Sequence, residues 1–108
     1  MPALAVNFKN TIADAEQTAF TSPPSGQGTR IDSFTVVNDS AVNASYEVYI
    51  DTGVGTTAPI IPFRVVVWGD IDLGIGLVNQ VIPPNASVKV VSSAVDSLYF
   101  TITGVNLD

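Results

Sequence analysis

The sequence predicts an all-β protein: a single antiparallel β-sandwich, of jelly-roll or immunoglobulin-like topology, with an N-terminal arm. Short segments in which apolar and polar residues alternate recur at intervals of roughly 10 to 15 residues. Turn-forming Gly, Pro, Asn and Asp separate these segments. No segment shows the sustained 3.6-residue apolar period of a long helix. The chain of 108 residues is long enough to bury one hydrophobic core but not two, which favours one domain.

Residues 1–17 differ from the rest of the chain. The stretch "ALAVNF" is apolar and precedes the regular strands, so we expect either an arm that contacts a neighbouring subunit or the first strand of the sandwich. Thr11 and Asp14 have the spacing of a weak capping box, which makes a helical turn an alternative to extended structure. Residues 18–108 are assigned to the sandwich domain.

The first strands of the domain are expected before residue 50. A short strand in "TAFT" is followed by a loop, because the two prolines of "SPPSGQG" cannot continue a ladder. The stretch "RIDSFTVVNDSAVNASYEVYI" then alternates, breaks at polar residues and alternates again, which predicts a strand, a loop and a strand. The residues expected to share inward faces are Phe34 and Val36, and then Tyr46, Val48 and Ile50.

The second half of the chain predicts further strands, for a total of six to eight. "IIPFRVVVWGD" is β-branched and aromatic, and Pro62 restricts its early part to an edge or a bulge. "GDIDLGIG" carries three glycines and two aspartates, so we expect it to break any regular element. "LVNQVIPPNASVKVVSS" predicts two strands with a Pro-Pro-Asn corner. "SLYFTITG" is the clearest strand, with Leu98, Phe100 and Ile102 on one face.

Composition argues against an enzyme and assigns no catalytic or cofactor-binding residue. The chain has no histidine and no cysteine, so imidazole catalysis, disulfides and thiolate metal sites are excluded. Asp70 and Asp72 are the most ligand-like pair, because Asp-x-Asp in a Gly-containing loop offers oxygens to calcium. An EF-hand would need a glutamate at position 81, which is Val81. We therefore expect a solvated loop, with no metal site and no cofactor.

Charge and hydropathy exclude two classes of partner. The net charge is −6, and the four basic residues lie far apart, so we expect no nucleic acid partner; they are Lys9, Arg30, Arg64 and Lys89. The longest apolar stretch, "APIIPFRVVVW", contains Pro and Arg and is shorter than the roughly 20 residues of a spanning helix, so we expect no membrane partner. "MPALAVNFKN" lacks the basic region of a signal peptide, which favours synthesis in a cytoplasm.

Aromatic residues offer one further reading, a carbohydrate-binding module. Stacking on a sugar needs two or three rings on one exposed face. Strand parity places Tyr46 inward, whereas Tyr49 and Tyr99 point outward, and it indicates no shared platform with Trp68. We expect these rings to serve in core packing or contact with a protein, and we expect no small-molecule substrate.

From Thr18 onward the order of features resembles a family of small tailed-bacteriophage virion proteins. The matching pieces are "TAFTSPPSGQGTRIDSFTVVNDSAVNASYEVYI", "GLVNQVIPPNASVKVVSS" and "SLYFTITGVNL", which together with the stretches between them span about 90 residues. The corner departs from the family pattern, because Pro84-Asn85 stands where the family has Pro-Gly. Asn also tolerates left-handed backbone, so the turn remains feasible.

The resemblance implies a non-enzymatic capsid decoration, or cement, protein that binds the assembled phage head and stabilises it. Its implied partners are the major capsid protein and neighbouring copies of itself, and its implied location is the virion, after synthesis in the host cytoplasm. A tail, neck or baseplate adaptor or fibre component is the alternative within the virion. Residues 1–17 and the proline-stiffened "TTAPIIPF" are the expected contact segments.

Overall fold

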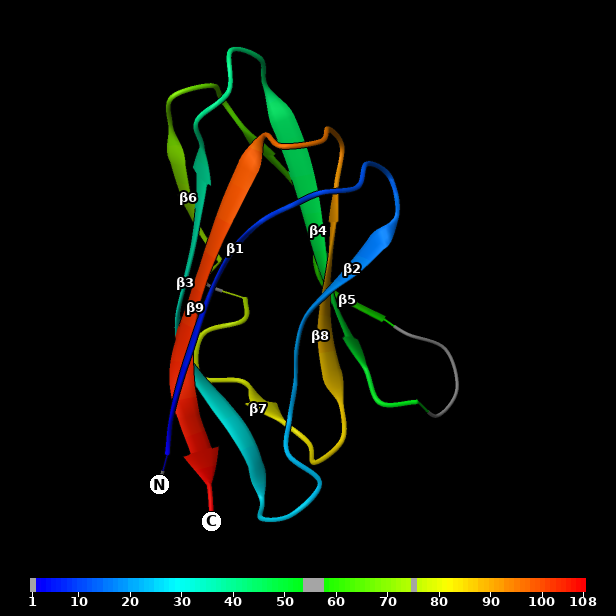
Figure 1. Cartoon of the computed structure of the whole chain (residues 1–108), viewed down its shortest axis with the longest axis vertical. Helices are drawn as coiled ribbons and strands as arrows, with labels where there is room; N and C mark the ends of the chain where they lie inside the picture. Colours follow the sequence, from blue (N-terminus) through cyan, green and yellow to red (C-terminus); the bar gives the residue numbers. More distant parts are fainter. Residues whose placement is uncertain (1, 54–57, 75) are drawn as a thin grey trace.

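The computed structural model describes residues 2–53, 58–74 and 76–108, and these form two antiparallel sheets and no helix. Figure 1 shows the sheets facing each other as the two layers of a sandwich. Sheet A has the order β1-β9-β3-β6, with β7 also paired to β3, and sheet B has the order β2-β8-β4-β5. The strands are β1 Ala3–Lys9, β2 Glu16–Thr21, β3 Gly28–Asn38, β4 Ala44–Asp51, β5 Ala58–Val66, β6 Ile71–Leu73, β7 Val81–Ile82, β8 Ser87–Ser92 and β9 Leu98–Leu107.

The strand order is that of a jelly roll. β6 and β7 pair with different parts of β3, so together they act as one interrupted edge strand and leave eight strands in two four-stranded sheets. The first four strands alternate between the sheets, and the last strand lies between β1 and β3. An immunoglobulin fold would place its first two strands in one sheet. The sandwich predicted from the sequence is therefore confirmed, and its topology is a jelly roll.

The expectation that "GDIDLGIG" breaks all regular structure was wrong. Ile71–Leu73 forms β6, whose residues pair with Thr35 to Val37 of β3. After β6 the chain leaves the ladder, and β7 then pairs with Thr29 and Arg30. Glycines on both sides of the three-residue strand hid it, because so short a segment has no measurable period. With β6 included, the described residues hold nine strands rather than six to eight.

The alternation seen in the sequence defines the core. The side chains expected to share inward faces are buried, except Ile50, which is only partly buried and packs against the core. The centre is a group of three aromatic rings, with the ring centroids of Phe34, Tyr46 and Phe100 5.9 to 6.0 Å apart. Aliphatic side chains from both sheets surround it: Ile31, Val36, Val48, Leu77, Ile82, Val88, Val90, Leu98 and Ile102.

The N-terminal segment lies in sheet A. β1 pairs antiparallel with β9 along its whole length, from Ala3 opposite Val105 to Lys9 opposite Tyr99. Residues 12–15 form bends, and the capping-box spacing of Thr11 produces no helical turn. The chain then crosses to sheet B and enters β2.

The two proline-containing stretches behave as their chemistry predicts. β5 is an edge strand, and its register with β4 shifts across Pro62 and again between Pro59 and Ile61, which agrees with an edge or a bulge. At the corner between β7 and β8, Asn85 has a φ of 67°, so asparagine supplies the left-handed residue there.

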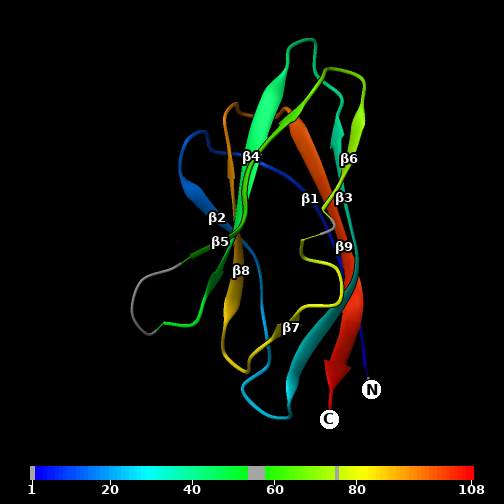
Figure 2. The same ribbon diagram turned by 180° about the vertical axis from the view of Figure 1, so that it is seen from behind.

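The sandwich has two open sides. β1 and β2, one edge from each sheet, face the viewer in Figure 1, and β5 and β6 face the viewer in the reverse view of Figure 2. Both termini lie at the same end of the molecule (Figure 1). In the described residues there is no helix long and apolar enough to cross a membrane.

Candidate interaction surface

Large apolar side chains gather on the side of the sandwich formed by β5, β6 and the turn between them. Each is about half exposed or more, from 47% for Val67 to 61% for Trp68. We call this set the β5–β6 rim: Phe63, Val65, Val67, Trp68, Ile71 and Leu73. Single exposed apolar residues are normal, but six within eleven residues of chain are the usual mark of an interaction site.

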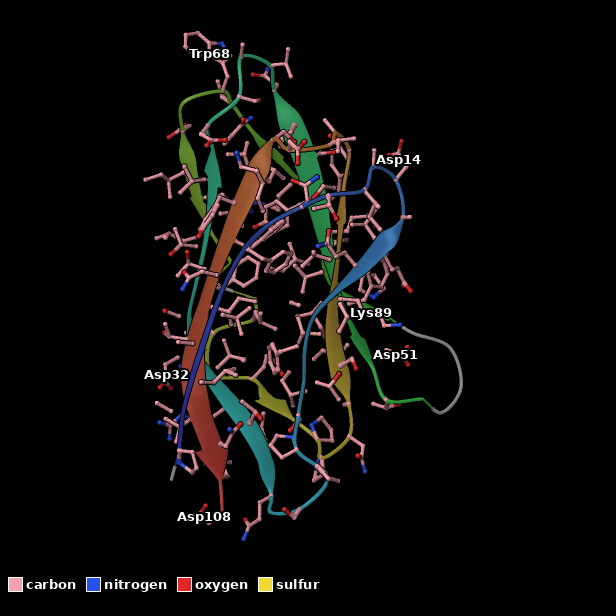
Figure 3. The ribbon with its side chains drawn as sticks, viewed as in Figure 1. Asp14, Asp32, Asp51, Trp68, Lys89 and Asp108 are labelled. Carbon is pink, nitrogen blue, oxygen red and sulfur yellow. The ribbon has the colours of Figure 1, made fainter. Side chains whose placement is uncertain are left out.

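The rim wraps around a convex edge rather than covering one flat face. Val65 lies opposite Ser45 on the outer face of sheet B, whereas Ile71 and Leu73 lie on the outer face of sheet A. Trp68 sits in the connecting turn, and Figure 3 shows its side chain at the extreme end of the molecule. Its backbone N–H donates to Asn43 Oδ1 at 3.2 Å, which holds the turn against the β3–β4 loop.

A polar link inside the edge supports the rim. Tyr46, Arg64 and Asp72 come from β4, β5 and β6, so the link spans both sheets. The Tyr46 hydroxyl donates to Asp72 Oδ2 at 2.6 Å, and Arg64 Nη2 donates to Asp72 Oδ1 at 3.0 Å. The Arg64 side chain points toward Asp72 because Arg64 lies opposite the inward Tyr46, beside the bulge in β5.

The environment of Tyr46 keeps its hydroxyl protonated. Burial raises the pKa of this phenol far above its ordinary value of 10, and the hydrogen bond to Asp72 raises it further. A neutral phenol is the donor that a carboxylate accepts, so the link is intact over the whole neutral range.

A small cavity of about 90 Å³ lies beside this link, between the two sheets. Tyr46, Ile61, Arg64, Leu73, Gly74 and Gly76 line it. It has room for a few water molecules and is far below the volume of a typical small-molecule site. It therefore gives no support to a substrate pocket.

The structure separates the two aspartates that the sequence presented as a ligand-like pair. Asp72 points inward, and both of its oxygens already accept hydrogen bonds from Tyr46 and Arg64. Asp70 Oδ1 accepts from the backbone N–H of Ile71 at 2.8 Å. Among the described residues there is no cluster of three or more metal-ligating side chains. Asp72 thus has a structural role that the sequence alone did not indicate.

The aromatic residues do not form a shared platform in the described structure. Tyr46 is buried, as expected, and Tyr99 is 39% exposed on the outer face of sheet A. Tyr49 lies on sheet B, where its hydroxyl donates to Glu47. Trp68 stands at the end of the molecule (Figure 3). Among the described residues the ring contacts join only Phe8, Phe34, Tyr46 and Phe100, so Tyr49, Trp68 and Tyr99 do not stack on one another.

All four basic side chains form ion pairs with acidic side chains. Lys9 pairs with Asp39, Arg30 with Asp32 and Arg64 with Asp72. Lys89 lies between two acids of sheet B, with its Nζ 3.1 Å from Asp51 and 3.9 Å from Glu16; Figure 3 shows Lys89 and Asp51 on the same side of the molecule.

The backbone N–H of Gly53 lowers the pKa of Asp51, and the hydrogen bond from Lys89 lowers it further. Asp51 therefore stays ionised, and around Lys89 the outer face of sheet B carries two acidic groups, Asp51 and Glu16, for one basic group.

The sequence identified part of the rim and missed the rest. Of the segment "TTAPIIPF", residues 56 and 57 lie outside the described part of the chain, and Phe63 belongs to the rim. Val65, Val67, Ile71 and Leu73 were not singled out. Phe63, Val65 and Val67 share one strand parity across the interrupting Arg64, a period-2 signal that would have predicted them.

No known protein-family model matches the chain, and no curated protein has a significantly similar sequence.

Proposed function

We propose that this chain is a non-enzymatic virion protein that decorates an assembled phage head and stabilises it. The β5–β6 rim is the observation that carries the proposal, because it is a large exposed apolar surface on an otherwise well-packed small domain. The order of sequence features supplies the virion setting. The fold is compatible with it, since jelly rolls are common in viral capsid proteins, but a fold alone does not decide a function.

The shape of the rim favours an assembled partner. Its side chains point outward from both faces of one edge, so they fit a crevice better than a flat surface. Junctions between capsid subunits are crevices that exist only after assembly. A protein that binds only the assembled state stabilises it by mass action, which is how a cement protein would strengthen a shell.

The net charge of the chain limits the kind of crevice. The whole chain carries a net charge of −6, and away from the rim the outer face of sheet B also has more acidic than basic groups around Lys89. We therefore expect a partner surface with an apolar centre and basic groups at its margin. Such complementarity would raise the association rate and make binding weaker at high salt.

The first test is the number of copies of this chain per purified particle, measured by quantitative mass spectrometry against the major shell protein. A ratio near one to one, or a simple fraction of it, is the expected result. A ratio below about one in thirty would instead place the chain at a unique vertex or in the tail, as an adaptor. Absence from the particle would overturn the virion proposal.

The second test uses two matched substitutions and co-sedimentation with assembled shells. Val65 is 55% exposed within the rim, and Val95 is 52% exposed in the loop before β9. We expect Val65→Ser to weaken shell binding about tenfold, the effect of losing an apolar contact that is buried on binding, while Val95→Ser leaves it unchanged. Equal effects of the two substitutions, or none, would show that the rim is not the contact surface.

A further inference from the structure

The four edges of the sandwich are not equally protected against pairing with another strand. The register of β2 with β8 shifts between Thr18 and Phe20, and that of β5 with β4 shifts twice. The edge of sheet A beyond β3 is interrupted between β6 and β7. β1 pairs with β9 without any shift over seven residues and contains no proline. Bulges, prolines and breaks are the devices that keep sheet edges apart, and β1 lacks all three.

The backbone of β1 offers a regular row of hydrogen-bonding groups to solvent. The Asn106 N–H donates to the Pro2 carbonyl, and the Asn10 N–H donates to the Leu98 carbonyl, so the even-numbered residues turn their backbone toward β9. Because antiparallel pairs alternate, the N–H and C=O groups of Ala3, Ala5, Asn7 and Lys9 point away from β9. Within the part of the chain that the structure describes, no hydrogen bond uses these groups.

The inward side chains of β1 are incompletely covered. Leu4, Val6 and Phe8 pack against the core but are only partly buried, although Phe8 stacks on Phe100 at a ring-centroid distance of 5.2 Å. A strand added beyond β1 would cover the exposed part of all three, because its own inward side chains would lie beside theirs.

We propose that this edge pairs with the β1 strand of a second copy of the chain, antiparallel and across a two-fold axis at Val6. In that register Ala3 lies opposite Lys9 of the other copy and Ala5 opposite Asn7. Leu4 lies opposite Phe8, and Val6 meets itself. Each pair of odd-numbered residues exchanges two backbone hydrogen bonds, and the two A sheets become one continuous sheet.

The composition of β1 makes a second copy the best-matched occupant. All seven residues find a partner in this register, and the inward row remains entirely apolar. The single charge, Lys9, lies at the end of the strand opposite an alanine, so no like charges meet. The outward side chains at the centre, Ala5 and Asn7, are small and exposed and do not obstruct approach.

The first experiment measures the monomer–dimer equilibrium by sedimentation and reverses charges across the axis. Ala5→Lys with Asn7→Lys places like charges directly opposite each other, whereas Ala5→Lys with Asn7→Glu places opposite charges there. Both positions are exposed on the outer face, so both variants keep the fold, which circular dichroism checks. We expect wild type and the Lys/Glu variant to dimerise, and the Lys/Lys variant to dimerise about 30-fold more weakly than the Lys/Glu variant.

The second experiment tests the register through disulfide formation, which is clean because the chain has no cysteine. Val6→Cys places two thiols at a non-hydrogen-bonded pair, where Cα atoms about 4.5 Å apart allow a bond. Leu4→Cys is the matched control, because its counterpart in the other copy lies four residues further along the strand. We expect a covalent dimer under mild oxidation from Val6→Cys and none from Leu4→Cys.

Two results would overturn the proposal. Wild-type protein that remains monomeric up to ~1 mM, a concentration at which even weak self-association is detected, shows that the edge does not pair with itself. Such a result leaves the edge open to a strand from another protein. A dimer that the Lys/Lys variant retains at wild-type strength shows that the copies meet through another surface.

Discussion

Asn38 ties together three separate segments at one end of the sandwich. Its side chain is fully buried, and its Nδ2 donates to the carbonyls of Val42 at 2.9 Å and Val66 at 2.8 Å. Its Oδ1 accepts from the N–H and the hydroxyl of Ser40. One amide thus closes the β3–β4 loop and anchors the end of β5, from which the rim turn begins. Both the donor and the acceptor of the amide are needed for this role.

We predict that Asn38→Asp lowers the free energy of unfolding by about 2 to 4 kcal/mol, because a carboxylate cannot donate to the two carbonyls and is buried without a cation. Urea unfolding measures the loss. Asn43→Asp is the matched control, because Asn43 is exposed and its Oδ1, which accepts from the Trp68 N–H, is kept in an aspartate. An effect of Asn43→Asp as large as that of Asn38→Asp would contradict this account.

Gly74 is required by close packing rather than by backbone conformation. A Cβ atom at this position would overlap the ring of Phe34, one of the three central aromatic residues. We predict that Gly74→Ala destabilises the fold by about 1 to 3 kcal/mol, the usual cost of overpacking. In a Phe34→Leu background the same substitution should cost less, because the smaller side chain leaves space. Additive costs in this double-mutant cycle would show that the two residues do not conflict.

At the scale of elements, the Tyr46–Asp72–Arg64 link joins β4, β6 and β5 across the open edge. Because Tyr46 titrates, the link makes the stability of the fold depend on pH in the alkaline range. The pKa of Tyr46 is raised in the folded state, so between pH 10 and the folded pKa the folded chain holds a proton that the unfolded chain has lost. The contribution is fully present below pH 10 and declines as the pH rises above it.

Tyr46→Phe removes both the hydrogen bond to Asp72 and this titration. We predict that the variant is less stable than wild type by about 1 to 3 kcal/mol at pH 7, and that the difference shrinks above pH 10. Thermal unfolding at several pH values measures both effects. A difference that stays constant from pH 7 to pH 11 would mean that the phenol does not titrate abnormally.

The strands that the sequence predicted most clearly are those with enough length to show alternation. Leu98, Phe100 and Ile102 in β9 gave a clear inward row, and each is fully buried. β6 failed because three residues between glycines have no period. Asp72 was misjudged for the same reason, since an aspartate in an unrecognised strand looks like a loop residue. Its partners come from two other strands, and only the paired register brings them together.

At the scale of the whole molecule, the jelly roll could not be separated from the immunoglobulin topology by sequence. The distinction depends on which strands are neighbours, and the decisive pairs join distant parts of the chain, such as Leu4 with Gly104. Alternation reveals which face of a strand is buried but not the strand beside it. Four of the six rim residues were missed for a related reason, because β5 and β6 share one side of the sandwich only after they have joined different sheets.

The same topology places the two proposed surfaces on opposite sides of the domain, with β1 on one side and the β5–β6 rim on the other (Figures 1 and 2). A dimer formed through β1 would therefore leave both rims free and directed away from the two-fold axis. It could bind two sites of a symmetric shell at once, and the second contact would be intramolecular. Such a linkage strengthens apparent binding by about 10²- to 10⁴-fold when the geometry allows both contacts.

If both proposals hold, the Ala5→Lys, Asn7→Lys variant should bind assembled shells with an intact rim but at least tenfold more weakly than wild type, because it binds as a monomer. Co-sedimentation at a protein concentration that keeps wild type dimeric measures this loss. The Ala5→Lys, Asn7→Glu variant should regain wild-type binding, because it changes the same two positions and keeps the dimer. Weak binding by both variants would place residues 5 and 7 in the shell contact itself, and undiminished binding by the Lys/Lys variant would show that each domain binds the shell alone.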